Sequence, residues 1–384
     1  MRIVQSAIGK FRHFELAKEL LEEGVLLKFF IALSKSFLGN EGLPLNLIET
    51  FPWFETPHKV LQRFGLGSGP MGRVWRRQAL KTFDAYVARR LPNCDGMISL
   101  SGNGLLTGKR IQERGGFYIC DRGSSHIRYE EEILLEEYRE WKLPFKGIDP
   151  WIIEREVAEY EQADVVMVPS TFAQRSFMEK GVARAKVERI TYGMNLKRFY
   201  KTQDPPSDAF HILFVGQISL TKGILYLLQA FARLRHCRKR LFVVGGMSSS
   251  FKEIFRKYST EGAEWVGIVA KDRLKDYYSR SHVLVLPSVT EGLGMVLVES
   301  MACGCPVIAS ENTAGPDIFT DGKEGFIVPI RDVRILAERL QQLADDPELQ
   351  KRFSAAALER FTYLSESRTE RERLIKMLTR LHRS

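Results

Sequence analysis

Two glutamates with seven residues between them, Glu291 and Glu299, mark the stretch of the chain best suited to chemistry. Gly292 and Gly294 follow the first glutamate, and glycine lets a backbone approach a ligand without side chains in the way. A helix is expected over 295–303, and the N–H groups and dipole at the start of a helix favour an anion. The pattern therefore predicts a phosphate site with a carboxylate on either side of it.

The two carboxylates are expected to contact different parts of one long ligand. Eight residues of helix rise about 12 Å and turn about 80° beyond whole turns, so Glu291 and Glu299 do not share a face. Carboxylates accept hydrogen bonds in pairs, which suits the vicinal hydroxyls of sugars. An anion site between two such acids predicts binding of a sugar diphosphate nucleotide. The alternative is that Glu291 caps the helix and Glu299 is only solvated.

The stretch from Glu291 to Glu299, Glu-Gly-Leu-Gly-Met-Val-Leu-Val-Glu, resembles the E-x7-E motif of retaining GT-B glycosyltransferases (family 4, also described as glycosyl transferases group 1). Its flanks 286–288, 302–309 and 321–329 also resemble this family. The resemblance covers the C-terminal half of the chain well and the N-terminal half loosely. It implies an α/β fold of the GT-B type, with two doubly wound Rossmann-like domains and an interdomain cleft.

A second strand–glycine–helix pattern follows the expected strand 211–215. Here the sequence resembles the family's Gly-Arg-x4-Lys-Gly, with Gln217 in place of the arginine. Lys222 at the start of the helix would neutralise charge on the donor diphosphate. The resemblance implies catalytic roles for Glu291, Lys222 and His126, and donor binding by Gly216, Gln217, Lys222, Val266, Gly294, Met295, Val296 and Glu299.

The N-terminal half offers weaker candidates at the carboxyl ends of expected strands, where open parallel sheets bind ligands. Gly9 and Lys10 follow the first strand and are interpreted as an acceptor or phosphate loop, although Gly9 can equally be a simple turn glycine. His126 lies in a polar glycine loop after the strand 116–120. By the resemblance it would contact the transferred sugar, and the alternative is a loop histidine that bonds its own backbone. A likeness of 101–110 to a P-loop is rejected, because its glycine and Ser/Thr spacing fails.

Local patterns also predict the elements that position these residues. Strands are expected over 2–7, 25–33, 96–102, 116–120, 163–169, 211–215, 241–246 and 283–286, and helices over 11–23, 71–91, 130–140, 331–363 and 365–383. The acidic helix 130–140 is interpreted as a solvated face. The helix 71–91 carries six basic residues against a single acid, Asp84. It is interpreted as a core helix with a solvated face, and the alternative is contact with an anionic membrane surface.

The composition is that of a globular chain long enough for two domains. It has 384 residues, a net charge of +10 and five scattered cysteines. Such cysteines predict a reducing environment without a disulfide framework, and no metal site is expected. No signal peptide is expected, and no run approaches the ~20 apolar residues of a transmembrane helix. Zinc-finger spacing, a basic-region helix and an aromatic–basic RNA motif are absent from the sequence, so a nucleic-acid partner is not expected.

The expected function is therefore retaining transfer of a sugar from a UDP- or GDP-sugar to a glycan, a lipid-linked acceptor or a small hydroxyl acceptor, without a metal cofactor. The use would be in cell-surface polysaccharide or glycolipid synthesis, in the cytoplasm or at the inner face of the membrane through residues 71–91. The expected organisation is an acceptor-side domain (1–200), a linker (201–208), a donor domain (209–364) and a helix that returns to the first domain (365–384). The alternatives are a non-catalytic nucleotide-sugar or membrane-surface binding protein and a GT-B sugar-nucleotide epimerase.

Overall fold

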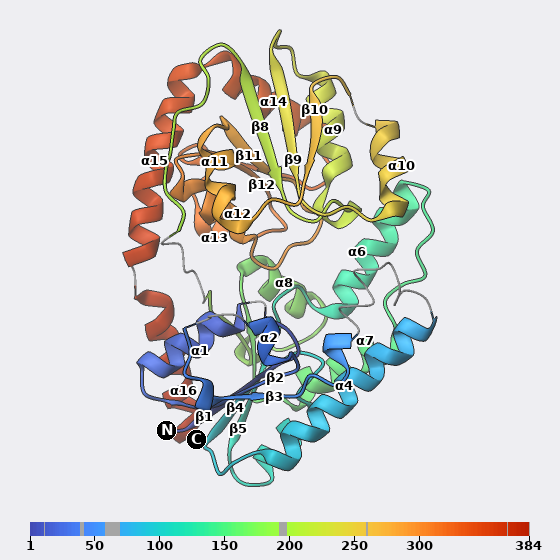
Figure 1. Ribbon diagram of the computed structural model, residues 1–384, viewed down its shortest axis with the longest axis vertical. Coiled ribbons are helices and arrows are strands. Elements are labelled where there is room, and N and C mark those ends of the chain that lie inside the picture. The colour runs from blue at the N-terminus through green and yellow to red at the C-terminus, as the bar shows by residue number, and fades with distance from the viewer. Residues whose placement is uncertain are drawn as a thin grey trace.

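The chain folds into two parallel β-sheets with helices on both faces, one below the other in Figure 1. The computed structural model describes residues 1–10, 12–38, 42–57, 70–191, 198–258, 260–366 and 368–383. Every strand pairing in these sheets is parallel. The expectation of two doubly wound α/β domains is confirmed.

The first sheet has seven strands in the order β3-β2-β1-β4-β5-β6-β7. Their bounds are β1 Ile3–Ala7, β2 Leu26–Ile31, β3 Ile48–Thr50, β4 Gly96–Leu100, β5 Phe117–Asp121, β6 Val165–Val168 and β7 Val187–Arg189. Ile3 and Ala7 of the central strand pack into one apolar core, and Val4 and Ile8 pack into another on the opposite face. Burial on both faces explains why these strands are continuous apolar runs in the sequence.

The second sheet has six strands in the order β10-β9-β8-β11-β12-β13. Their bounds are β8 Phe210–Val215, β9 Lys239–Val244, β10 Ala263–Gly267, β11 Val283–Leu286, β12 Val307–Ser310 and β13 Gly325–Val328. In both sheets the chain continues in opposite directions from one central strand, β1 or β8. The points beside β1 and β8 are topological switch points, where open α/β sheets leave a crevice at the carboxyl ends of their strands.

Helices pack against both sheets. In the first half they are α1 His13–Glu22, α2 Lys35–Leu38, α4 Pro70–Arg90, α5 Leu105–Gln112, α6 Ile127–Glu140, α7 Pro150–Gln162 and α8 Thr171–Glu179. In the second half they are α9 Ile224–Arg233, α10 Ser249–Tyr258, α11 Leu274–Ser279, α12 Met295–Ala302, α13 Gly315–Ile318, α14 Val333–Asp345, α15 Pro347–Glu366 and α16 Thr369–Arg383.

One expectation about helices is confirmed and one needs correction. The stretch 331–363 is helical and consists of two helices, α14 and α15, because Pro347 cannot continue a helix and instead opens the next one, which Asp346 caps. The helix 130–140 is not a solvated acidic face throughout. Glu137 in α6 is fully buried, because this helix lies against residues of the second half of the chain.

The last helix returns to the first sheet. Leu374, Met377 and Leu378 of α16 belong to the same buried cluster as Ile3 and Phe29. In Figure 1, α15 runs along one side of the molecule and α16 continues beside α1. This contact agrees with a last helix that returns to the first domain, and the domain bounds 1–200, 209–364 and 365–384 remain a proposal.

One glycine fixes how the loops after β8 and β11 pack. Gly223, between Lys222 and α9, has a φ of 67°, and a Cβ added to it would lie 1.9 Å from the carbonyl oxygen of Pro287. The main chains of the two loops are therefore in direct contact. The amide of Val289 also donates to the carbonyl of Thr221 at 2.9 Å.

We expect Gly223→Ala to destabilise the protein severely. A left-handed alanine alone costs about 1–2 kcal/mol, and here the methyl group would also overlap Pro287. Gly115→Ala is the matched control, because Gly115 has a φ of 79° with nothing within 4 Å of an added Cβ. Urea unfolding should show a clearly larger loss for the Gly223 variant. Equal losses would mean that the two loops move apart without cost.

Candidate active site

The loops that follow β8 and β11 bring the strongest sequence candidates together. The ammonium group of Lys222, in the 3-10 turn Leu220–Lys222, is ion-paired with the carboxylate of Glu291. Both side chains are mostly buried, since 24% of Lys222 and 17% of Glu291 remain exposed. Burial lowers the pKa of Lys222 to about 8, and the carboxylate of Glu130 acts in the opposite direction. The pair forms a polar centre at the switch point of the second sheet.

Glu130 is a residue that the sequence analysis missed. It lies in the first turn of α6, a helix that packs against the turn that carries Lys222. Its carboxylate is 2.5 Å from Arg122 Nη2, and Arg122 Nη1 is 2.9 Å from Glu156. A chain of charges therefore runs from Lys222 into the first domain. The only feature of the sequence that could have indicated Glu130 is its position in the first turn of a helix that follows the end of a strand.

We expect Glu130→Gln to move the alkaline limit of nucleotide binding to lower pH. Without this carboxylate the pKa of Lys222 should fall further below its usual value, so the ammonium loses its proton earlier as pH rises. A neutral amine binds a diphosphate less well than an ammonium group does. Calorimetric titration with UDP between about pH 6 and about pH 10 would measure the shift. Glu132→Gln, an exposed change on the same helix, is the control, and an equal shift there would contradict a specific role for Glu130.

Helix α12 begins directly at the Lys222–Glu291 pair. Its N-cap is Gly294, with a φ of 76° and no side chain to bond the first N–H groups. Met295 and Val296 in the first turn are half-buried. The expected strand, glycine turn and helix are thus confirmed, and the helix start has the geometry that suits an anion. Phosphate binding at these residues remains a prediction.

Glu299 lies one turn further along α12 and is buried. Its carboxylate accepts a hydrogen bond from the hydroxyl of Tyr278 at 2.9 Å, and Lys271 Nζ is 3.9 Å away. Burial raises the pKa of Glu299, while Lys271 and the Tyr278 hydrogen bond oppose this effect. The two glutamates point to different surroundings, as the helix geometry indicated. The role of Glu299 toward a ribose remains a prediction.

The remaining donor-side candidates lie at the ends of β8 and β10. Gly216 follows β8, and a Cβ on Gly245 would lie 1.8 Å from its carbonyl oxygen, so this turn tolerates no side chain at Gly245. Gln217 is exposed and Val266 in β10 is half-buried. Trp265 Nε1 donates to the carbonyl of Gly245 at 3.0 Å, which holds β10 against this turn.

His126 serves as the N-cap of α6. Its Nδ1 accepts from the backbone N–H of Arg128 at 3.2 Å, and its ring packs between Tyr160 and Phe177 with centroids 5.1 and 4.9 Å away. Burial, together with nearby cations, lowers its pKa to about 4. The structure therefore gives this histidine the local backbone bond that the sequence left open as an alternative. Contact with a transferred sugar remains a prediction.

Gly9 and Lys10 lie in the turn between β1 and α1, at the switch point of the first sheet. Gly9 is buried, and Lys10 Nζ donates to the carbonyl of Leu38 at 2.7 Å. The turn is at the expected edge of the sheet. Its lysine is bonded to the chain itself in this structure, and an acceptor or phosphate role remains a prediction.

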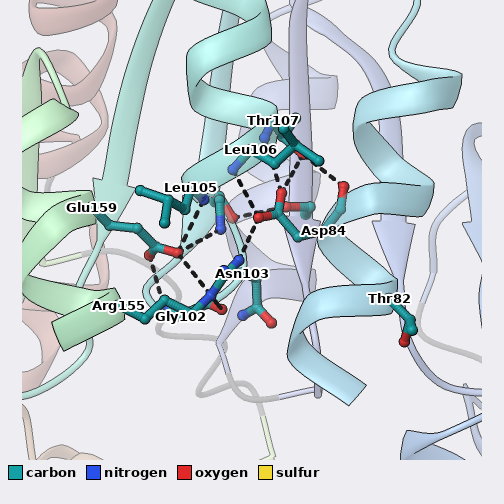
Figure 2. Close-up of polar contacts among 12 residues, drawn as sticks. Thr82, Asp84, Gly102, Asn103, Leu105, Leu106, Thr107, Arg155 and Glu159 are labelled. Atoms are coloured by element: carbon teal, nitrogen blue, oxygen red, sulfur yellow. Dashed lines mark hydrogen bonds and ion pairs between the residues drawn. The ribbon is translucent and has the colours of Figure 1, made fainter. Parts of the chain in front are cut away.

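The start of α5 is occupied by carboxylates of the protein, as Figure 2 shows. Glu159 of α7 accepts from the N–H groups of Gly102, Gly104 and Leu105 at 2.6, 2.9 and 3.1 Å. Asp84 of α4 accepts from the N–H groups of Leu106 and Thr107 at 2.8 and 2.9 Å, and Arg155 lies between the two acids. Burial raises the pKa of Glu159 to about 8. Because the carboxyl groups of Glu159 and Asp84 already accept hydrogen bonds from these amides, the rejection of a P-loop at 101–110 agrees with the structure.

The two halves of the chain meet directly beside the Lys222–Glu291 pair. Ser125 Oγ and Thr290 Oγ1 are 3.2 Å apart and buried. A Cβ added to Gly292 would lie 1.9 Å from the carbonyl oxygen of Gly123, so the backbones of the two domains touch there. The loop after β5 therefore contacts the loop after β11. No local pattern in the sequence indicates this contact.

Two features are absent from the residues that the structure describes. None of their helices is both long and apolar enough to cross a membrane. No group of three or more His, Cys, Asp or Glu side chains is arranged to hold a metal ion among them.

The second half of the chain is similar to known glycosyltransferases. Residues 197–360 match the family model described as Glycosyl transferases group 1. The D-inositol 3-phosphate glycosyltransferase of Streptomyces bingchenggensis is 34% identical over 188 residues, which are 43% of this chain and 41% of that protein. The putative colanic acid biosynthesis glycosyltransferase WcaL of Escherichia coli is 28% identical over 217 residues, which are 51% of this chain and 53% of that protein. The chain thus matches about half the length of these curated relatives.

Solved structures resemble the chain over its whole length. A sucrose-phosphate synthase from Thermosynechococcus elongatus superposes with a TM-score of 0.74, at 22% identity and over 99% of both chains. Anabaena HepE, solved in complex with UDP and glucose, gives a TM-score of 0.70 at 14% identity, also over 99% of both chains. The chain therefore has the GT-B fold, and its second domain carries the group 1 glycosyltransferase match.

Proposed function

We propose that this protein is a retaining glycosyltransferase that moves a sugar from a nucleoside diphosphate donor to a hydroxyl acceptor. The observation that carries the proposal is the mostly buried Lys222–Glu291 pair at the start of α12, at the switch point of a domain that matches group 1 glycosyltransferases. An ammonium group, an uncapped helix start and a carboxylate meet there. These are the groups that a sugar diphosphate requires.

Each group has a proposed role in the reaction. Lys222 and the amides at 294–296 would hold the diphosphate and stabilise the charge that it gains on leaving. Glu291 would accept hydrogen bonds from the transferred sugar, and Glu299 from the ribose. The acceptor hydroxyl would attack on the face that the diphosphate leaves and pass its proton to the leaving phosphate oxygen. This route needs neither a metal nor a separate base.

The domain contact beside the site supports this chemistry. Because Gly292 touches Gly123 and Thr290 approaches Ser125, the loop between β11 and α12, which we call the donor loop, is closed against the first domain. Closure of this kind excludes water and so limits hydrolysis of the donor. The acceptor would enter along the first domain, past Gly9 and Lys10.

The proposed setting is assembly of a cell-surface polysaccharide or glycolipid. One relative is named for colanic acid biosynthesis, and a Klebsiella pneumoniae protein from a cps region is 27% identical over 194 residues. Among the donor nucleotides, UDP is the first to test, because HepE was solved in complex with UDP.

A thermal-shift screen of UDP-, GDP- and ADP-sugars would test donor binding. A ligand that binds only the folded state raises Tm by mass action. We expect one nucleotide class to stabilise the wild type and to lose this effect in Lys222→Ala. Transfer or donor hydrolysis that disappears in Glu291→Ala would then separate an enzyme from a nucleotide-sugar binding protein. If no nucleotide sugar raises Tm, the donor site as proposed is wrong.

We also propose peripheral contact with an anionic membrane, at the first turn of α4 and not along the whole helix. Arg77 forms a double hydrogen bond with Asp149 at 2.6 and 2.8 Å, and Arg76 bonds Glu55 at 3.1 Å, so these charges are already paired. Met71 is 86% exposed, and Arg73 beside it is also exposed. An exposed apolar side chain next to a cation suits a lipid surface.

Flotation with liposomes that contain an anionic lipid would test this contact. The double variant Met71→Ser/Arg73→Glu should float less than the wild type. The control Lys109→Glu changes charge on α5 at a side chain that is 71% exposed, and it should float normally. Undiminished flotation of the double variant would exclude the first turn of α4 as the contact.

A further inference from the structure

A second cavity lies between the two halves of the chain, at the opposite end of α6 from the Lys222–Glu291 pair. It has a volume of about 620 Å³, which is within the range of ligand sites. One side comes from the C-terminal end of α6 and residues 141–143, and the other from α9, α10 and residues 331–333. In Figure 1 this end of α6 lies close to α10. From Glu130 to Glu140 the helix rises about 15 Å, so the cavity is separate from the donor site.

Three aromatic rings line this interdomain cavity. Trp141 packs edge-on against Tyr226 and Tyr258, with ring centroids 5.4 and 5.2 Å apart. Trp141 belongs to the first half of the chain and the two tyrosines to the second. Aromatic rings of this kind offer apolar surface together with polar edges.

Two lysines at the cavity carry unpaired positive charge. Lys142 and Lys257 are exposed, and no carboxylate lies within ion-pair distance of either ammonium group among the residues that the structure describes. Lys257 Nζ lies over the ring of Tyr258, 5.5 Å from its centroid. Arg331 also lines the cavity, but its charge is taken up by Glu136 and Glu137 at 3.2 and 2.8 Å. The cavity therefore combines an aromatic wall with the ammonium groups of Lys142 and Lys257, and the carboxylate of Glu140 lines it as well.

The backbone around the cavity is strained. Lys142 and Arg331 have φ values of 53° and 63°, and no other non-glycine residue has a positive φ among the residues that the structure describes. Such conformations persist only when their surroundings hold them, and they gather at functional sites. Both of them line this one cavity.

A buried carboxylate holds the cavity wall in place. Glu137 is fully buried and accepts hydrogen bonds from Trp141 Nε1 at 2.9 Å, Tyr226 OH at 3.0 Å and Arg331 Nε at 2.8 Å. One side chain thus fixes a ring from each half of the chain together with the strained arginine. A wall arranged before a ligand arrives reduces the entropy cost of binding.

We propose that this cavity binds an anionic sugar, a pyranose ring that carries a phosphate or a carboxylate. The ring would lie against the aromatic wall, and the anionic group would contact Lys142 and Lys257. That the ligand is a sugar and not another anion with an apolar face rests on the proposed function. The source is either a free sugar phosphate or an acidic unit of a glycan. Because the wall comes from both domains, the ligand would hold them in this arrangement.

Isothermal titration of the full chain would test the site, with glucose 1-phosphate in one arm and a glucuronate-containing tetrasaccharide in the other. We expect at least one probe to bind, and to bind about tenfold or more weakly to Lys142→Gln/Lys257→Gln, because two charge-assisted contacts are lost. The control is Lys146→Gln/Arg256→Gln. It removes the same charge from the same loop and helix at exposed residues outside the cavity.

A parallel titration with UDP separates this site from the donor site. UDP should bind equally to both double variants, whether or not the proposed transfer reaction is correct. Binding of one probe alone identifies the source of the ligand, and binding of both supports the shared chemistry. The proposal is overturned if neither probe binds, if both double variants lose binding equally, or if Lys222→Ala abolishes binding of the probe.

Discussion

Lys222→Ala should lower kcat by roughly 10²–10³-fold, the usual cost of removing one preorganised donor that stabilises developing charge. Lys222 is the cation in contact with Glu291 at the start of α12, and it is mostly buried. When the bond to the sugar breaks, negative charge grows on the leaving diphosphate. Because the site is shielded from water, no solvent ion can replace the missing ammonium group without cost. Initial rates at saturating donor would measure the loss.

Two controls distinguish chemistry from folding. Lys323→Ala removes an exposed lysine from the same domain, away from the site, and should leave kcat unchanged. The Tm of Lys222→Ala without ligand should stay close to that of the wild type, while the rise in Tm with a nucleotide should disappear. A large fall in the unliganded Tm would instead identify Lys222 as a structural partner of Glu291. A wild-type kcat would remove Lys222 from the proposed mechanism.

The donor-side elements could be predicted from the sequence because their signals are local. The stretches around Lys222 and Glu291 each read as an apolar strand, a glycine turn and a helix, and each of these elements is present. The contact between the two side chains could not be read from the sequence, since 69 positions separate them. It depends on the close approach of Gly223 to the carbonyl oxygen of Pro287, which becomes visible only when the two loops are packed together.

Partners from other elements account for what the sequence analysis missed. The stretch 71–91 contains basic residues and one acid, Asp84, but the structure pairs Arg77 with Asp149 and Arg90 with Glu49, which lie outside this stretch. Asp84 itself is buried at the start of α5. A helical pattern shows which face of one helix is polar, but it cannot show that a second element covers this face.

The contacts between the two domains were the hardest to predict from the sequence. The acidic pattern of 130–140 indicates a solvated helix, yet α6 lies between the domains, with Glu130 toward Lys222 and Glu137 bonded to Arg331. Acidic residues are rarely buried without partners, so the base rate favoured the solvated interpretation. Only the arrangement of the two domains supplies these partners.

Gly292→Ala should separate catalysis from donor binding. A methyl group on Gly292 would lie 1.9 Å from the carbonyl oxygen of Gly123, so the two domains could not keep their contact. Misplacement of reacting groups by about 1 Å can cost about 10²-fold in rate. We therefore expect kcat to fall by about that factor. The affinity for UDP should change only a few-fold, because the donor loop of the second domain remains intact.

The same contact provides its own control, because its two glycines are not equivalent. An added Cβ on Gly123 meets nothing within 4 Å, so Gly123→Ala should keep a wild-type kcat although the residue touches Gly292. Steady-state rates and UDP titration on the two alanine variants would compare them directly. A normal kcat for Gly292→Ala would show that the rate of turnover does not depend on this contact between the domains. Loss of UDP binding in that variant would instead mean that Gly292 shapes the donor loop itself, and that the closed arrangement is not what limits the rate.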